Sequence, residues 1–314
     1  MQAGGERMAS TSEIRRRIGS VRQTQKITHA MYLISQAKLR KAKQELSNTR
    51  PYFDALQTEI GRVFNADAAV ESRYLEPAQL PVKEVPLRPA CLLITADKGL
   101  AGAYNQNVLK EAQHMLDTHP DTKLFVVGEY GRQYFMRHNI PIERSFLYTA
   151  QNPTMQRARE ITAVLLERFE SGELQKIYVI YTDIKNSLAE NVHSARMLPF
   201  HRSVFTAPAG EKKVQDPFEF YPSVTGVLDN IVHSYVSGYI YSALIDSFCS
   251  EQNARMSAMS TANENAEKML SSLGLEYNRI RQAAITQEIT EVAAGARAQR
   301  LRKAANTKKR GDTP

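Results

Sequence analysis

Apolar residues recur every three or four positions near both ends of the chain. Two stripes result, made of Ile14, Ile18, Val21, Thr24, Ile27, Met31, Ile34 and Ala37, and of Ala266, Met269, Leu273, Tyr277, Ile280 and Ala284. This spacing is typical of one face of an α-helix. Two such stripes at opposite ends of a sequence predict an antiparallel, left-handed coiled coil. Two faces of a helical bundle are the alternative, although the sequence offers no third and fourth long helix.

The C-terminal segment contains no proline from Ser223 to Thr313. If Val224 to Ala304 forms one helix, that helix is on the order of 120 Å long at about 1.5 Å per residue. A chain of this size cannot bury such a rod along its length. We therefore expect the rod to pair with another helix, to enter another protein, or both. In the N-terminal segment the first breaker is Pro51, after which we expect the helix to resume through Phe64.

The middle of the chain has a different pattern. Short apolar runs at 90–95, 123–127 and 176–182 predict buried strands, and a further strand is expected at 191–199. Helical stretches near 105–116, 130–137 and 154–169 alternate with them. Such alternation predicts βαβ units and a largely parallel sheet. Linkers are expected on either side, where prolines cluster at Pro77, Pro81, Pro86 and Pro89 and at Pro208, Pro217 and Pro222.

These patterns predict an α/β fold with long helices, in which a Rossmann-like α/β domain is inserted between the two helices of an antiparallel coiled coil. We expect coiled-coil helices at residues 1–64 and 223–304 and the α/β domain at 65–222. Residues 305–314 form a basic tail, which we expect to be disordered or to emerge beyond any enclosing partner, because buried charges without partners are costly.

The charge of the chain is concentrated at its ends. The formal net charge is +8, but residues 1–50 hold 11 Lys/Arg against 3 Asp/Glu, and residues 297–314 hold 7 against 1. The ends together carry +14, so the body carries −6. Basic ends of this kind suit nucleic acid, an anionic membrane surface or an acidic protein loop. The arms lack the interleaving of aromatic and basic residues that is typical of a base-stacking surface, which argues against nucleic acid.

Several classes of protein are disfavoured. Two cysteines provide neither a disulfide framework nor metal spacing, and they suit a reducing compartment. The sequence contains no run of about 20 apolar residues, so no membrane-spanning helix is predicted. The seven histidines show no metal-ligand spacing, and no nucleophile elbow or HExxH motif is present. We therefore expect no catalytic residue, no cofactor and no metal site.

One glycine-rich loop, Asp97–Asn105 (DKGLAGAYN), follows the first predicted strand. A strand–glycine loop–helix junction can bind phosphate at the helix N-terminus. The loop matches neither GxGxxG nor GxxxxGK[ST], so a tight structural turn is favoured and a nucleotide-dependent α/β enzyme stays open as an alternative.

The end of the long helix is small and apolar over much of its circumference between Ala283 and Ala296. A helix that is apolar all round is usually buried. Since a first arm starting near Ser12 would leave this tip unpaired, we expect a separate protein to enclose it. Packing of the tip on its own α/β domain is the alternative.

Three long segments resemble the gamma subunit of F-type ATP synthase: Glu13–Met31 (EIRRRIGSVRQTQKITHAM), Arg255–Ala266 (RMSAMSTANENA) and Tyr277–Ile289 (YNRIRQAAITQEI). The loop Ala96–Gly102 (ADKGLAG) is similar to that family's loop, with Lys98 and Ala101 where arginine and cysteine are frequent. The resemblance extends from about Ser12 to Ala296.

The resemblance implies a non-catalytic central shaft that rotates inside a hexamer of alpha and beta subunits and couples transmembrane ion flow to ATP synthesis or hydrolysis on beta. It implies docking on the epsilon subunit and the membrane c-ring, peripherally at the cytoplasmic face of the bacterial cell membrane. The residues that it implies as hexamer contacts are Lys26, Met31, Arg255, Arg281, Gln282, Thr286 and Glu288, with Lys38, Arg40 and Lys41 in the basic run around Met31.

Overall fold

The computed structural model describes residues 11–66, 72–76, 88–147, 149–186, 189–201, 205, 221 and 223–311. Its two long helices are α1 (Thr11–Ala66) and α5 (Val224–Gly311). The chain divides into two compact units. We call residues 1–31 and 259–314 the coil unit and Tyr32–Ala258 the sheet unit. Of the predicted linker prolines, Pro89 falls in a described segment, where it begins the first strand; the others lie outside the described residues, namely Pro77, Pro81, Pro86, Pro208, Pro217 and Pro222.

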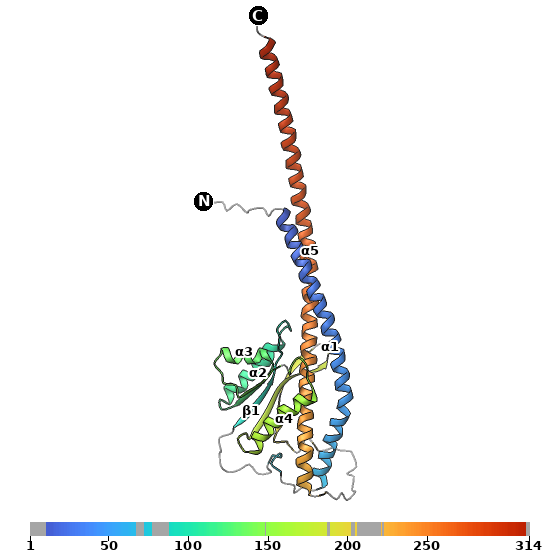
Figure 1. Cartoon of the computed structure of the whole chain (residues 1–314), viewed down its shortest axis with the longest axis vertical. Helices are drawn as coiled ribbons and strands as arrows, with labels where there is room; N and C mark the ends of the chain where they lie inside the picture. The colour runs from blue at the N-terminus through green and yellow to red at the C-terminus, as the bar shows by residue number, and fades with distance from the viewer. Residues whose placement is uncertain are drawn as a thin grey trace. The chain divides into compact units, whose positions relative to one another are not determined.

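The coil unit pairs the start of α1 with the distal part of α5, and the two segments run antiparallel (Figure 1). Arg15 donates a hydrogen bond from Nη2 to the Tyr277 hydroxyl at 3.1 Å, and its guanidinium lies 5.8 Å from the centre of that ring. Further along, the Thr28 hydroxyl donates to Oδ1 of Asn263. The predicted pairing of the N- and C-terminal helices is confirmed.

The inward-facing residues of the coil unit recur mostly every three or four positions. On the coil-unit part of α1 the buried and half-buried positions are Thr11, Glu13, Ile14, Ile18, Val21, Gln25, Thr28 and Met31; on α5 they include Met259, Ala266, Leu270, Leu273, Tyr277 and Ile280. The predicted stripes were wrong at Thr24, Ile27, Ile34, Ala37, Met269 and Ala284, which are all exposed. A coiled coil holds a 3.5-residue repeat, so the seam passes through polar Gln25 and Thr28 in place of the apolar neighbours that sequence reasoning selected.

The described residues of the sheet unit form five strands: β1 (Pro89–Ile94), β2 (Lys123–Val127), β3 (Arg144–Phe146), β4 (Lys176–Asn186) and β5 (Ala189–Leu198). Their order is β3-β2-β1-β4-β5. The first four strands are parallel and β5 pairs antiparallel with β4. The largely parallel sheet is confirmed, but β3 was not predicted, because its three residues carry too little apolar pattern.

Helices cover both faces of the sheet. On one face α2 (Tyr104–Thr118) and α3 (Glu129–Arg137) pack against Cys91 and Leu93. On the other face α4 (Met155–Glu170) and the sheet-unit parts of α1 and α5 pack against Ala90, Leu92 and Ile94. Successive β1 residues thus point into opposite cores, as a strand covered on both faces requires. The predicted fold class, long helices with an inserted Rossmann-like domain, is confirmed.

The helix α1 continues through Pro51, where sequence reasoning placed a breaker. A proline inside a helix removes one backbone hydrogen bond and costs about 3 kcal/mol. Pro51 itself is exposed, while Phe53, Leu56 and Ile60 beyond it pack in the core. Burial of these side chains explains why the helix persists, since tertiary packing commonly overrides local preference.

The helix α5 extends to Gly311, past its predicted end at Ala304. Residues 305–310 contain neither glycine nor proline, so nothing in the local sequence stops the helix before Gly311. The division into domains at residues 64, 222 and 304 stays a proposal; the compact units instead divide each long helix, near Met31 and near Met259.

Candidate functional site: the glycine-rich loop and the partner surface

The glycine-rich loop joins β1 to α2 at the carboxyl edge of the parallel strands. Its start is fixed by Asn105, whose Oδ1 accepts from the backbone N–H of Ala96 at 3.0 Å. The backbone N–H of Glu129 donates to Oδ1 of Asp97 at 2.9 Å, which ties the loop to the start of α3. Ala101 and Tyr104 are buried in a small cluster with Ala96 and Ala254 of α5. The loop is therefore fastened both to the sheet and to α5.

Arg255 is buried beside this loop, with 9% of its surface exposed. Its Nη1 lies 2.5 Å from Oε1 of Glu251, one helical turn earlier on α5. Its Nη2 donates to the carbonyl oxygens of Gly99 at 3.2 Å and of Lys98 at 3.5 Å. Burial raises the pKa of Glu251, whereas the adjacent guanidinium acts in the opposite direction. The resemblance implied a hexamer contact for Arg255; in this structure its side chain is engaged within its own chain.

The polarity of the loop does not favour phosphate binding. A phosphate site needs backbone N–H groups directed at the anion. Here the carbonyls of Lys98 and Gly99 accept from Arg255, and the carboxylate of Asp97 stands at the start of the same loop. Carbonyl and carboxylate oxygens repel an anion, so the geometry favours a structural turn over the nucleotide-dependent enzyme.

Lys26 and Met31 lie on the α1 segment of the coil unit. Lys26 is exposed and Met31 is half-buried at the seam. Next to Lys26, Ile27 is exposed by 54%, and Met269 on α5 is exposed by 53%. The coil unit thus presents apolar side chains outside its seam beside a basic residue. This mixture of apolar and charged side chains is chemically suited to contact with another protein.

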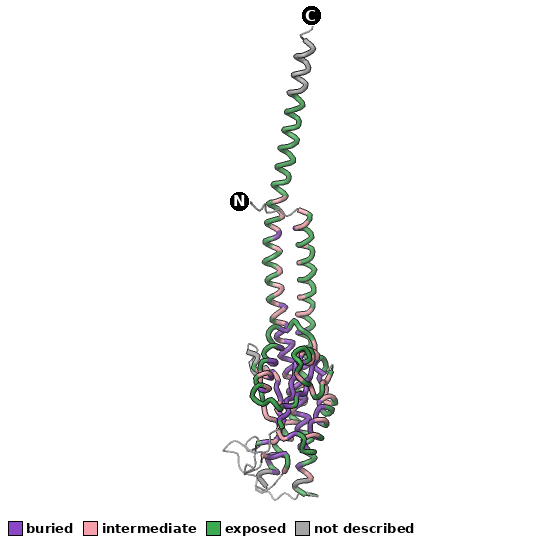
Figure 2. Tube along the Cα trace, turned by 90° about the vertical axis from the view of Figure 1, so that its left-hand side faces the viewer, coloured by how far each residue is buried: buried purple, intermediate pink, exposed green. Residues whose placement is uncertain are grey.

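The distal part of α5 is exposed at every position from 281 to 300 (Figure 2). It carries Arg281, Gln282, Thr286 and Glu288, and the Thr286 hydroxyl donates to the Gln282 carbonyl of its own helix at 2.9 Å. At 3.6 residues per turn, these four residues fall within about 160° of the helix circumference. The exposed apolar residues Ile285, Ile289 and Val292 fall within the same arc. One side of the tip therefore combines apolar and polar side chains.

The comparisons with known proteins decide the family. A model of the ATP synthase family, described as "ATP synthase", matches residues 10–299. The ATP synthase gamma chain of Caldanaerobacter subterraneus subsp. tengcongensis is 41% identical over 292 residues, covering 90% of this chain and 98% of the relative. The "ATP synthase gamma chain, sodium ion specific" of Acetobacterium woodii is 34% identical, covering 92% of this chain and 98% of the relative.

This chain belongs to the ATP synthase gamma chain family.

Solved structures agree on the gamma-chain fold. A chain in the mitochondrial ATP synthase of Euglena gracilis, solved with OSCP, F1 and c-ring in rotational state 3, superposes with a TM-score of 0.65. It is 15% identical, and the match covers 93% of this chain and 95% of that one. A chain of the central stalk and c-ring structure from Tetrahymena thermophila gives a TM-score of 0.58 at 23% identity, over 75% and 99% of the two chains. At these identities the likeness shows the fold alone.

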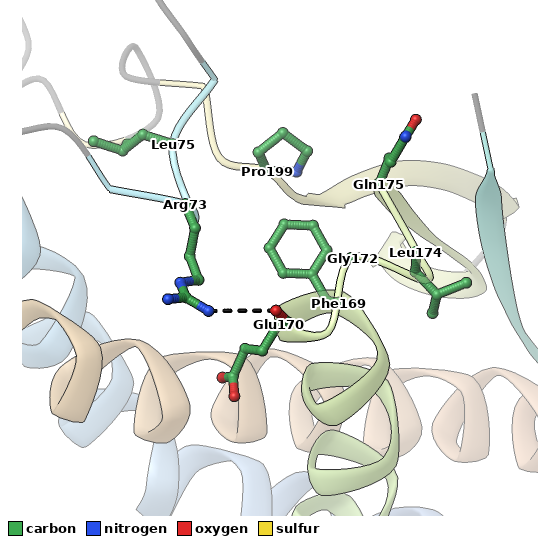
Figure 3. A pocket seen from close by; sticks show the side chains of 8 residues that line it. All are labelled: Arg73, Leu75, Phe169, Glu170, Gly172, Leu174, Gln175 and Pro199. Atoms are coloured by element: carbon green, nitrogen blue, oxygen red, sulfur yellow. Dashed lines mark hydrogen bonds between the residues drawn. The ribbon is translucent and has the colours of Figure 1, made fainter. Parts of the chain in front are cut away.

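A cavity of about 570 Å³ opens elsewhere in this gamma chain's sheet unit (Figure 3). Arg73 points across it and donates to the carbonyl of Glu170 at 3.4 Å. The cavity lies beside Leu174 and Gln175, just before β4 begins, and so at the amino edge of the parallel strands. Ligands of open α/β sheets bind at the carboxyl edge, so this position gives no support for a substrate site.

Within the described residues, no three His, Cys, Asp or Glu side chains are grouped so that they could hold a metal ion. Nor does any described helix have the length and apolar character needed to cross a bilayer.

Sequence reasoning missed two features of the gamma chain's interior. The ion pair of Glu251 and Arg255 could have been predicted from its i,i+4 spacing. Nothing in the sequence indicates that Arg255 also contacts the loop at residues 98–99. The hydrogen bond from the Ala96 N–H to the Asn105 side chain depends on the fold of the β1–α2 junction and has no local sequence motif.

Proposed function

We propose that this gamma chain is the central rotor shaft of an F-type ATP synthase, turning inside a hexamer of alpha and beta subunits. The supporting observation is the distal part of α5, where apolar Ile285, Ile289 and Val292 are exposed beside the polar residues expected to contact the hexamer. Exposed apolar side chains on a helix favour enclosure by another protein. The partner that the family offers for this role is the alpha/beta hexamer.

The proposed mechanism is coupling by shape. An asymmetric shaft makes different contacts with each beta subunit, and each orientation favours one conformation of each nucleotide site through differential contact energy. Rotation driven by ion flow would then move the sites through their conformations in turn. In this mechanism the chain itself binds no nucleotide and catalyses no step, and its orientation regulates the ATPase activity of its partners.

The contacts proposed with the hexamer follow charge and exposure. Lys26 and the neighbouring basic residues suit an acidic loop of beta, and Met31 lies half-buried beside them. Arg281, Gln282, Thr286 and Glu288 suit a polar collar around the tip. Charge matching of this kind sets specificity and orientation more than affinity. Arg255 is included by resemblance, although its buried guanidinium suggests an indirect role.

The sheet unit is proposed to dock on the epsilon subunit and the c-ring. The complex would then hold the chain peripherally, at the cytoplasmic face of the bacterial cell membrane.

Reconstitution tests the proposal. Alpha and beta subunits assembled with this chain, and joined to the membrane sector in vesicles, should pump ions when ATP is added. The hexamer without the chain should hydrolyse ATP without pumping, and the isolated chain should show no ATP turnover. Full coupling in the absence of the chain would overturn the proposal.

A further inference from the structure

The glycine-rich loop of the α/β domain contacts α5, through Ala254 and Arg255. Two residues of this loop have positive φ angles, Leu100 at 63° and Gly102 at 53°. The left-handed region is costly for a residue with a side chain. Leu100 therefore persists in this conformation only because its surroundings hold the loop in place.

Arg255 makes the polar contacts that fix this loop to α5. Its two terminal nitrogens are divided between partners: Nη1 pairs with Glu251 at 2.5 Å, and Nη2 donates to the carbonyls of Gly99 and Lys98 at 3.2 and 3.5 Å. A planar guanidinium can do this because its donors are fixed in a fork. Glu251 also accepts from Nε2 of Gln252 at 3.4 Å, which helps to orient the carboxylate.

The charges around the junction make Arg255 hard to replace. Glu251 is 6% exposed. Asp97, at the start of the loop, acts electrostatically on Glu251. One oxygen of Asp97, Oδ2, is buried and accepts no hydrogen bond from the described residues. Arg255 and, more weakly, Lys38 offset the negative charge of Glu251. Removing the guanidinium would therefore leave the buried Glu251 carboxylate with Asp97 nearby and only Lys38 to compensate it.

We propose that Glu251 and Arg255 form a clamp that locks the Lys98–Gly102 loop to α5, so that the α/β domain and α5 turn as one body. Arg255 is then a positioning residue, acting on coupling through the loop of its own chain. The inference rests on the proposed rotor function. A shaft whose α/β domain can shift against α5 would lose torque between the membrane sector and the nucleotide sites.

Three substitutions separate the elements of the clamp. Arg255→Gln removes the charge and the fork. Arg255→Lys keeps the charge but places all donors on one nitrogen, without the planar fork that spans the carboxylate and the loop. Glu251→Gln keeps the shape without the counter-ion. The matched control is Arg62→Gln, because Arg62 forms an exposed ion pair with Glu59 within α1 at 2.6 Å. All four are made in the full chain.

The first measurement is amide hydrogen exchange of the peptide covering residues 96–104, in the full-length chain. We expect exchange at least tenfold faster in Arg255→Gln, an intermediate increase in Arg255→Lys and in Glu251→Gln, and no change in Arg62→Gln. Exchange in the α2 and β2 peptides should stay at the wild-type rate, which shows that the domain is folded. Unchanged exchange of residues 96–104 in Arg255→Gln would overturn the clamp.

The second measurement is the number of ions pumped per ATP hydrolysed by the reconstituted complex. We expect this ratio to fall at least twofold in Arg255→Gln while ATP hydrolysis continues, and to recover partly in Arg255→Lys. If the loop exchanges faster in Arg255→Gln but the number of ions pumped per ATP stays at the wild-type value, the proposed role of the clamp in torque transfer is wrong. Failure of the rotor function itself would appear differently, as absence of coupling with the wild-type chain, while the exchange result would still judge the clamp.

Discussion

Gly238 shows how closely two helices approach in the sheet unit. It lies in the interior of α5, a few turns after the helix begins, where glycine normally costs about 1 kcal/mol relative to alanine. A Cβ placed at this position would overlap the ring of Phe53 on α1. The missing side chain therefore makes room for an aromatic ring that packs against the main core, with its centre 6.4 Å from that of Tyr241.

Gly238→Ala should destabilise the chain by about 1–2 kcal/mol, because overpacking typically costs about 1–3 kcal/mol and outweighs the gain in helix propensity. Gly274→Ala is the control, since a Cβ there meets nothing within 4 Å; it should stabilise by about 0.5–1 kcal/mol. Urea unfolding followed by circular dichroism measures both. Equal stabilisation by the two changes would show that Phe53 does not occupy the space.

Asp246 of α5 is the carboxyl group in the sheet unit with the clearest pH consequence. Burial, followed by the nearby charge of Asp183, raises the pKa of Asp246 from 3.8 to about 7, while Arg50 opposes the shift. A carboxyl whose pKa is raised by folding favours the folded state when it is protonated. Its stabilising contribution is complete below about pH 4 and is lost as the pH rises to about 7.

Asp246→Asn should therefore gain stability relative to the wild type as the pH is raised from 5 to 8, by about 1–3 kcal/mol at the upper end. The control is Asp54→Asn, at an exposed position of α1, which should show no such trend. Urea unfolding at several pH values provides the comparison. A constant difference between Asp246→Asn and wild type across this range would contradict the assigned environment.

At the scale of elements, sequence periodicity predicted the long helices and the strands at 90–95, 123–127 and 176–182, because each carries a long or strongly apolar pattern. It failed where packing decides. The seam of the coil unit passes through Gln25 and Thr28, since a constant 3.5-residue repeat matters more there than the hydropathy of single residues. The inward placement of Arg255 could not be predicted, because it depends on a loop more than 150 positions away.

Pro51→Ala should stabilise α1. Alanine restores the backbone N–H that proline lacks and removes its clash with the preceding turn, worth about 1–3 kcal/mol. Pro51 is exposed, so no core contact is lost. The expected result is a higher midpoint in thermal unfolding of the full chain, and an unchanged or lower midpoint would show that the proline fits a local bend.

Deleting the residues after Ala298 should leave assembly with alpha and beta subunits intact. The truncated segment contains the whole basic tail, residues 305–314, and also Arg300, Arg302 and Lys303; these charges are expected to lie beyond the enclosing surface of the hexamer. Size-exclusion chromatography of the mixed subunits provides the measurement. Loss of the assembled complex would mean that the tail is itself part of the interface.

At the scale of the whole molecule, each unit is suited to a different task. The coil unit combines a narrow heptad seam with exposed apolar residues outside it, as expected of a helix pair that a larger protein surrounds. The sheet unit has two well-buried cores and a loop fixed to α5 by a buried ion pair. We infer that the coil unit provides a contact surface for partner subunits that move relative to it, and that the sheet unit is a rigid support.

The most direct test of the rotor account observes rotation. The alpha/beta hexamer would be immobilised with this chain assembled in it, and a bead attached through a cysteine introduced at exposed Met136 of the sheet unit. The account predicts continuous rotation of the bead in one direction when ATP is supplied, and none without ATP. A bead that stays fixed while the complex hydrolyses ATP would contradict it.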